Sequence, residues 1–139
     1  MTGDETVRRW FTWPLLRVLL MCSLNALSIP GTSHSSLNRM FIYHIVLPEI
    51  WEQVRNEPLY RHESLSAEGF IHCSYEEQID GVIGRYYADR DELVVLTIDT
   101  DKLSARLVAE PSTGGEVYPH IYGPLNMVAV IDAETRPLK

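Results

Sequence analysis

The sequence predicts an α+β protein with a small, mostly antiparallel and split β-sheet and two helices. From Met40 onward the order of elements is strand, helix, strand, helix, and then a run of strands separated by short turns. Strands that follow each other this closely pair antiparallel, because a parallel crossover needs a dozen or more connecting residues. The chain is also 45% hydrophobic and 22% charged, a composition that can bury a core.

We expect one domain over residues 40–139, with residues 1–39 outside its fold. A basic start at Arg8-Arg9, an apolar stretch and a polar tail resemble an export signal, but Arg17 interrupts a run that is too short to span a bilayer. Three interpretations stay open: a targeting signal, an upstream extension with Met40 as the true start, and a membrane-surface anchor. Met40 directly precedes a clean strand, which favours the extension.

The first half of the domain is expected to hold two strands and both helices. An apolar, β-branched run predicts a strand over residues 41–47, and Pro48 suits the first turn of a helix that ends at Val54. Residues 56–66 are polar and predict a loop, with a short helical turn left open as an alternative, and residues 70–74 predict the second strand. Ser74 and Glu77 have the spacing of a capping box for a helix that runs to about residue 87.

The second half is expected to consist of strands. The strongest strand covers residues 92–99, and further strands are predicted over 106–110, 117–122 and 126–131. Pro119 places the strand over 117–122 at a sheet edge or a bulge, because proline cannot donate a ladder hydrogen bond.

Charge and cysteine content argue against a nucleic-acid-binding protein, a disulfide-rich protein and a zinc–cysteine site. Four of the 12 basic but only two of the 19 acidic residues precede Met40, so the domain keeps eight basic and 17 acidic residues, a charge of about −9. Such a domain repels nucleic acid at long range. The two cysteines, Cys22 and Cys73, have no metal-ligand or disulfide spacing, which suits a cytoplasmic, reducing location. An active targeting signal would instead place the protein outside the cytoplasm or at a membrane surface.

Three histidines occupy strand positions: His44, His72 and His120. His44 and His72 each share a strand face with apolar residues, where a polar ring needs a partner. Each is either a hydrogen-bonded core residue or part of a shared site. A zinc site of the three rings lacks any supporting motif, so no metal is expected.

The segment Tyr118-Pro119-His120-Ile121-Tyr122-Gly123-Pro124 is the most unusual stretch. It is either a structural edge with a turn or one wall of a ligand pocket, in which Tyr118 and Tyr122 stack on a ligand and His120 bonds a polar edge. Glu116 precedes it and is either an exposed carboxylate or part of the same site.

These segments together resemble a small bacterial family, domain of unknown function 952. The resemblance is carried by Phe41-Ile42-Tyr43-His44-Ile45, the helix with Trp51, the motif Glu68-Gly69-Phe70-Ile71-His72-Cys73-Ser74, and Pro119-His120-Ile121-Tyr122-Gly123-Pro124-Leu125. It covers essentially all of residues 40–131. It implies an ADP-ribosyltransferase-like fold, a split β-sheet that binds NAD in a central cleft.

The resemblance also implies roles for individual residues. His44 matches a first-strand position that bonds the adenosine ribose or nearby atoms, and His72 and Ser74 match a motif near the nicotinamide ribose. A late-strand catalytic glutamate is replaced by His120, with Glu116 four residues earlier. In this mechanism Glu116 stabilises an oxocarbenium-like state and His120 acts as general base.

Three function classes follow from the sequence. The first is an NAD-using transferase or glycohydrolase. The second is a non-catalytic module that binds a nucleotide-like small ligand in the same cleft. The third is a protein-interaction domain that keeps only a relic of the pocket. The orientation of Glu116 discriminates between the first two, because only a carboxylate that points into the cleft beside His120 favours catalysis.

Overall fold

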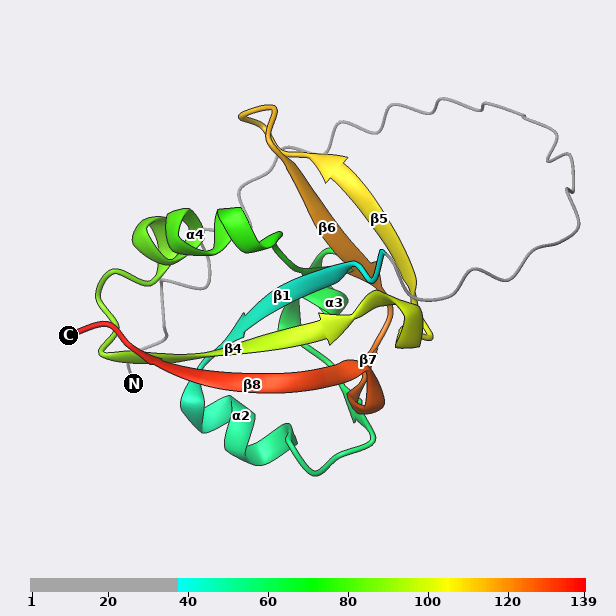
Figure 1. The fold of residues 1–139 in the computed structure, drawn as a ribbon, viewed down its shortest axis with the longest axis horizontal. Helices are drawn as coiled ribbons and strands as arrows, with labels where there is room; N and C mark the ends of the chain where they lie inside the picture. The colour runs from blue at the N-terminus through cyan, green and yellow to red at the C-terminus, as the bar shows by residue number, and fades with distance from the viewer. Residues whose placement is uncertain (1–37) are drawn as a thin grey trace, which may run out of the picture.

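The computed structural model describes residues 38–139, which form eight strands and three α-helices (Figure 1). The strands are β1 (Phe41–Val46), β2 (Leu59–Tyr60), β3 (Ile71–His72), β4 (Glu92–Asp99), β5 (Arg106–Pro111), β6 (Val117–Tyr122), β7 (Leu125–Asn126) and β8 (Val130–Pro137). The helices are α2 (Pro48–Val54), α3 (Glu63–Ala67) and α4 (Ile79–Tyr86). The segment predicted to precede the fold lies, up to residue 37, outside the described residues.

Two three-stranded sheets and one small ribbon make up the fold. The first sheet has the order β1-β4-β8, the second has the order β3-β6-β5, and β2 pairs with β7. Every one of these described pairs is antiparallel. The α+β prediction is therefore confirmed. A single bridge between Tyr43 and Ser74 joins the two larger sheets.

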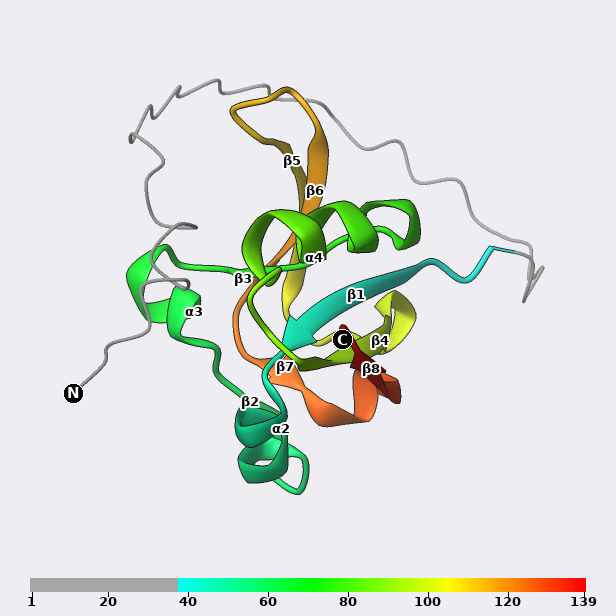
Figure 2. The same cartoon turned by 90° about the vertical axis from the view of Figure 1, so that its left-hand side faces the viewer.

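The core lies on both faces of β4, the strand that the sequence predicted most strongly. Its side chains alternate, so Val94, Leu96 and Ile98 pack on one face and Leu93 and Val95 on the other. Helix α2 adds Trp51 and Val54 to the first face, and α4 adds Ile79 and Val82 to the second. Figures 1 and 2 show these two helices on opposite sides of the β1-β4-β8 sheet.

Strand β6 lies at the centre of its sheet, so the expectation of an edge at Pro119 is wrong. The Pro119 carbonyl accepts a hydrogen bond from the Cys73 N–H at 3.0 Å. Because proline has no N–H, the reciprocal bond cannot form, and the ladder between β3 and β6 ends at this point. A central strand thus tolerates proline by shortening its neighbour.

Two other segments differ from the prediction. The loop expected over 56–66 contains the strand β2, while α3 is the short helical turn left open there. The strand expected over 126–131 is broken by a 3₁₀ turn, Met127–Ala129. The Met127 N–H donates to the Pro58 carbonyl at 3.0 Å, and the Asn126 side chain donates to the Lys102 carbonyl at 2.8 Å. Contacts with distant residues therefore hold this turn in place.

The helix expected from Tyr75 onward begins with a 3₁₀ turn, Glu76–Gln78, and continues as α4. Its first turn is closed by the Tyr75 N–H, which donates to Gln78 Oε1 at 2.9 Å, and not by a Ser74–Glu77 capping box. Ser74 is buried and its backbone is engaged in the bridge to β1, so it marks the end of the β3 segment.

Candidate functional site

The two larger sheets separate next to the bridge between Tyr43 and Ser74. These two residues exchange both backbone hydrogen bonds, each 2.8 Å long. In an antiparallel ladder the next exchanging pair would be Ile45 and His72. Instead, the His72 carbonyl accepts a hydrogen bond from Nδ1 of His44 at 2.8 Å. The His44 ring thus takes the bond that would otherwise continue the ladder and keeps the strands apart.

This separation exposes the backbone of Ile45. Since Tyr43 directs its N–H and carbonyl toward β3, Ile45, two residues later, directs its own groups to the same side. Within residues 38–139 no hydrogen bond occupies them there. One donor and one acceptor therefore face the gap between the sheets.

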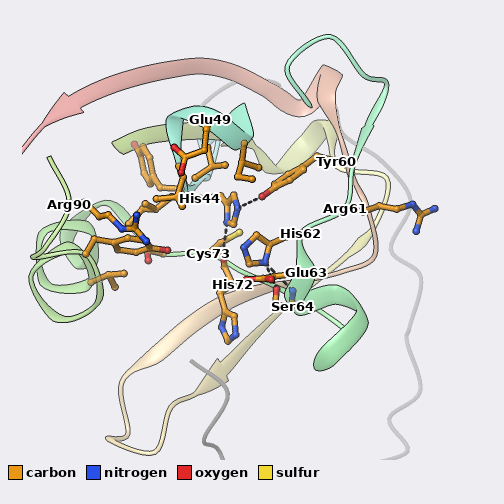
Figure 3. Close-up of a pocket in the computed structure, with 18 residues that line it drawn as sticks. His44, Glu49, Tyr60, Arg61, His62, Glu63, Ser64, His72, Cys73 and Arg90 are labelled. Atoms are coloured by element: carbon orange, nitrogen blue, oxygen red, sulfur yellow. Dashed lines mark hydrogen bonds between the residues drawn. The ribbon is translucent and has the colours of Figure 1, made fainter. Parts of the chain in front are cut away.

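A cavity of about 480 Å³ lies at this gap (Figure 3). Its size falls in the range of small-molecule sites, roughly 300 to 1,000 Å³. The aliphatic part of the wall comes from β1, the residue after it, α2 and α4: Ile45, Val46, Leu47, Ile50 and Val82. The polar and aromatic lining residues are Tyr43, His44, Glu49, Tyr60, Arg61, His62, Glu63, Ser64, His72, Ser74, Tyr87 and Arg90.

His44 is a neutral hydrogen-bond acceptor at the centre of this cavity. Its side chain is buried, and that burial, aided by the neighbouring His62, lowers its pKa to about 3. Nδ1 carries the proton that is donated to the His72 carbonyl, so Nε2 offers a lone pair. The Tyr60 hydroxyl lies 3.4 Å from Nε2. Burial raises the pKa of Tyr60, so its hydroxyl stays a donor.

His62 places a second ring against His44. It is the N-cap of α3, where its Nδ1 accepts from the Ser64 N–H at 3.1 Å. Nδ1 also lies 2.7 Å from the Ser64 hydroxyl, which lies 2.8 Å from the Phe70 carbonyl, so the direction of this hydroxyl sets the tautomer of the ring. The two imidazoles meet edge to face with centroids 5.2 Å apart, and burial lowers the pKa of His62 to about 4. The cavity thus presents the Nε2 acceptor of His44 beside a second neutral imidazole.

A second, smaller hollow of about 300 Å³ lies beside the β5–β6 hairpin. Its lining residues are His72, Arg85, Tyr86, Ser112, Thr113, Gly114, Glu116, Tyr118 and His120. The Tyr118 hydroxyl donates to Glu116 at 2.6 Å, and this bond, with help from Gln78 and Arg85, lowers the pKa of Glu116. Glu116 is thus an ionised carboxylate held by neighbours. His72 lines both hollows.

The two histidines that line the second hollow are each paired with a carboxylate. His120 is buried, and its Nδ1 lies 2.7 Å from Glu110. His72 Nε2 lies 3.1 Å from Glu68, and burial lowers the pKa of His72 to about 3. Phe70 stacks on His120 at a centroid distance of 4.2 Å.

The residues singled out in the sequence fall into two groups. His44 and Ser74 lie in the first cavity. Glu116, Tyr118 and His120 line the second hollow, and Tyr122 shares their face of β6 and bonds Glu110. His72 lies between the groups. The rings of His72 and His120 meet at 5.1 Å, whereas His44 contacts Tyr60 and His62 instead.

Sequence reasoning missed several side chains of this region. Tyr60 and His62 stood in a segment predicted as a loop, and Glu110 stood at the end of a strand with no motif around it. The one available signal was the sequence His62-Glu63-Ser64, in which a polar residue precedes an acidic first turn, as at a helix N-terminus. That signal would have located α3 but not its contact with β1.

Two negative observations limit the chemistry of the described residues. No group of three or more histidine, cysteine, aspartate or glutamate side chains in residues 38–139 is arranged to hold a metal ion. None of the helices in that range has the length and apolarity needed to cross a membrane.

The fold and the cavity define a small α+β domain with a ligand-sized cavity where its sheet splits. The chain belongs to the family described as "Protein of unknown function (DUF952)", whose family model matches residues 45–133. The resemblance to this family inferred from the sequence is therefore confirmed.

Solved structures of one bacterial protein share the fold. A crystal structure of protein CC0527 from Caulobacter crescentus matches with 28% sequence identity and a TM-score of 0.63, over 69% of this chain and 85% of that chain. A solution NMR structure of CC0527 matches with 28% identity and a TM-score of 0.59, over 68% of this chain and 82% of that chain. The comparison with curated proteins gives no match.

Proposed function

We propose that this domain binds a nucleotide-like small molecule that carries a carboxamide, with NAD as the leading candidate. The observation that carries the proposal is the N–H and carbonyl of Ile45 at the gap beside His44. A primary carboxamide supplies one acceptor and two donors. It can therefore pair with both backbone groups at once, as a neighbouring strand would.

The rest of the cavity suits the other parts of such a ligand. Nε2 of His44 can accept from a ribose hydroxyl that displaces the Tyr60 hydroxyl, and the Tyr60 and Ser74 hydroxyls then offer further polar contacts. Arg90 lines the same cavity and brings a cation that suits a diphosphate. The aliphatic side chains from β1, α2 and α4 supply the apolar surface that planar rings require.

Calorimetry on the full chain tests this proposal with NAD, nicotinamide and nicotinic acid. Nicotinamide should bind at least about tenfold more tightly than nicotinic acid, because a carboxylate cannot donate to the Ile45 carbonyl and leaves it unsatisfied. His44→Asn should weaken NAD binding about tenfold, because the amide keeps the bond to the His72 carbonyl but removes the Nε2 acceptor.

The control is Asp132→Asn, an exposed change on β8 away from both hollows, which should bind NAD like the wild type. Equal affinity for nicotinamide and nicotinic acid would contradict the pairing with Ile45. If the folded protein does not bind NAD, the proposal that NAD is the ligand is wrong.

An NAD-using transferase or glycohydrolase is the second candidate function. It is favoured by the fact that His72 lines both hollows, so that Glu116 and His120 lie in a space adjoining the ligand cavity. Loss of nicotinamide passes through an oxocarbenium-like state, which an ionised carboxylate such as Glu116 can stabilise. The Glu116 carboxylate points toward Tyr118 and Arg85. Its charge would therefore stabilise the ribose cation from the opposite side of the hollow.

Release of nicotinamide from NAD, measured by chromatography, tests this second candidate. Glu116→Gln should lower the rate by about 100-fold, because the amide keeps the shape but removes the negative charge. Folding is checked by the urea midpoint of each variant. An equal rate for wild type and Glu116→Gln would rule out this role for Glu116.

A further inference from the structure

Glu110 and His120 form a tightly held pair on one face of the β5–β6 hairpin. Glu110 Oε2 lies 2.7 Å from Nδ1 of His120, and the Tyr122 hydroxyl donates to the same carboxylate at 2.8 Å. Phe70 stacks on the imidazole with an angle of 19° between the planes. Glu110 and Phe70 thus hold the ring directly, and Tyr122 holds the carboxylate, before any ligand arrives.

The short contact with Glu110 decides which nitrogen of His120 carries the proton. A carboxylate oxygen accepts, so Nδ1–H must donate, and Nε2 of the neutral ring bears a lone pair. Within the described part of the chain, no hydrogen bond occupies this Nε2. Since the ring lines the second hollow, Nε2 is the nitrogen available to a molecule bound there.

His72, the other imidazole of the hollow, has its Nε2 engaged by Glu68 at 3.1 Å, and burial keeps the ring neutral, with a pKa lowered to about 3. In His120 it is Nδ1 that the carboxylate engages, so Glu110 lies beside the positive charge that forms when Nε2 accepts a proton. The arrangement matches a histidine general base supported by a carboxylate.

We propose that Glu110 and His120 are an acid–base pair that removes the proton of a hydroxyl acceptor, an alcohol or water, bound in the second hollow. This step depends on the transferase function proposed above. As the acceptor oxygen forms its bond to the ribose carbon of NAD, the bond to nicotinamide breaks and its electron pair leaves with nicotinamide. The proton moves to Nε2 of His120, and Glu110 remains ionised as the positioning residue.

The hollow has the lining that such an acceptor needs. Ser112 and Thr113 contribute hydroxyl groups, and Gly114 leaves the hairpin loop open beside them. Arg85 is half exposed and engaged with Tyr118 and Glu116, and the carboxylates of Glu68 and Glu110 lie against the two histidines, so carboxylates outnumber cations around the acceptor. A neutral hydroxyl compound therefore fits this hollow better than a phosphate does.

Nitrogen NMR of the full, ligand-free chain tests the pair directly, because the two tautomers of histidine have distinct ¹⁵N shifts. We expect the Nδ1–H tautomer for His120 in the wild type and in Glu110→Gln, whose amide oxygen can still accept. Glu110→Ala should shift the ring toward the Nε2–H tautomer. An Nε2–H tautomer in the wild type would overturn the pair, whether or not NAD binds.

Nicotinamide release then tests what the pair does. Glu110→Gln keeps the tautomer but loses the charge, so its rate should fall at least about tenfold while nicotinamide affinity stays the same. An unchanged rate in Glu110→Gln would overturn the catalytic use. If the wild type releases no nicotinamide, the NAD reaction is overturned, and the tautomer result still decides separately whether the pair exists.

Discussion

At the residue scale, burial keeps three histidine rings neutral: those of His44, His62 and His72. A neutral imidazole has one donor and one acceptor nitrogen, so the partner of one nitrogen determines what the other offers. In His44 a backbone carbonyl engages the donor, and in His62 a helix N-terminus engages the acceptor. The local partner of each ring therefore determines what that ring presents to the cavity.

These lowered pKa values predict that the fold loses stability in mild acid. In the unfolded chain each ring has a pKa near 6.5, so below this pH the unfolded chain binds protons that the folded chain does not. Stability should be full above about pH 6.5 and fall as the pH drops toward 4, by roughly 1 kcal/mol per pH unit for each of the three rings. Urea midpoints at pH 7.5, 6 and 5 measure this loss.

His44→Asn is the matched variant, because it keeps the bond to the His72 carbonyl and removes one titrating ring. Its stability should depend less steeply on pH than that of the wild type. Glu68 acts in the opposite sense, since burial raises its pKa and protonation there favours the folded state. A wild-type midpoint that stays constant from pH 7.5 to 5 would contradict the prediction.

At the scale of elements, the long strands could be predicted from the sequence because their signals are local. β4 has an apolar run and β1 a β-branched run, and each run predicts a buried strand whichever strand pairs with it. The short elements could not be predicted in this way. Strand β2 has two residues and exists because β7 pairs with it, and the turn after β7 depends on Pro58.

The same distinction explains how much of the candidate site could be predicted. The motif around His72 and the segment around His120 lie in one sheet, and the sequence marked both as unusual. The partners of His44 come from elsewhere: Tyr60 from a two-residue strand and His62 from the start of a five-residue helix. Such contacts depend on tertiary packing, which no local pattern encodes.

On the scale of the whole molecule, the split between the sheets creates the cavity. The order β8-β4-β1, the single bridge, and then β3-β6-β5 would make one continuous sheet if β1 and β3 paired along their length. The His44 ring interrupts that pairing, and residues of α4 and of the α2–α3 segment line the space that results. The cavity is therefore a property of the strand arrangement, and its chemistry comes from a few side chains.

The contacts of β1 and Met40 bear on the domain boundary expected near Met40. β1 pairs along its full length with β4, and Ile42 is fully buried. The Met40 carbonyl accepts from the Thr100 N–H at 3.2 Å and from the Thr100 hydroxyl at 2.8 Å. A fragment that begins at Met40 thus keeps every one of these contacts, whereas a fragment that begins after β1 loses a strand of the core.

We therefore expect residues 40–139 to fold independently, with a free energy of unfolding within about 0.5 kcal/mol of that of the full chain. A fragment of residues 47–139 is the control and should fail to show a cooperative urea transition, because β4 would lose its partner strand and the core its Ile42 side chain. Urea unfolding followed by tryptophan fluorescence measures both, since Trp51 packs against this core. A fragment of residues 40–139 that is less stable by more than about 2 kcal/mol would place the boundary earlier in the chain.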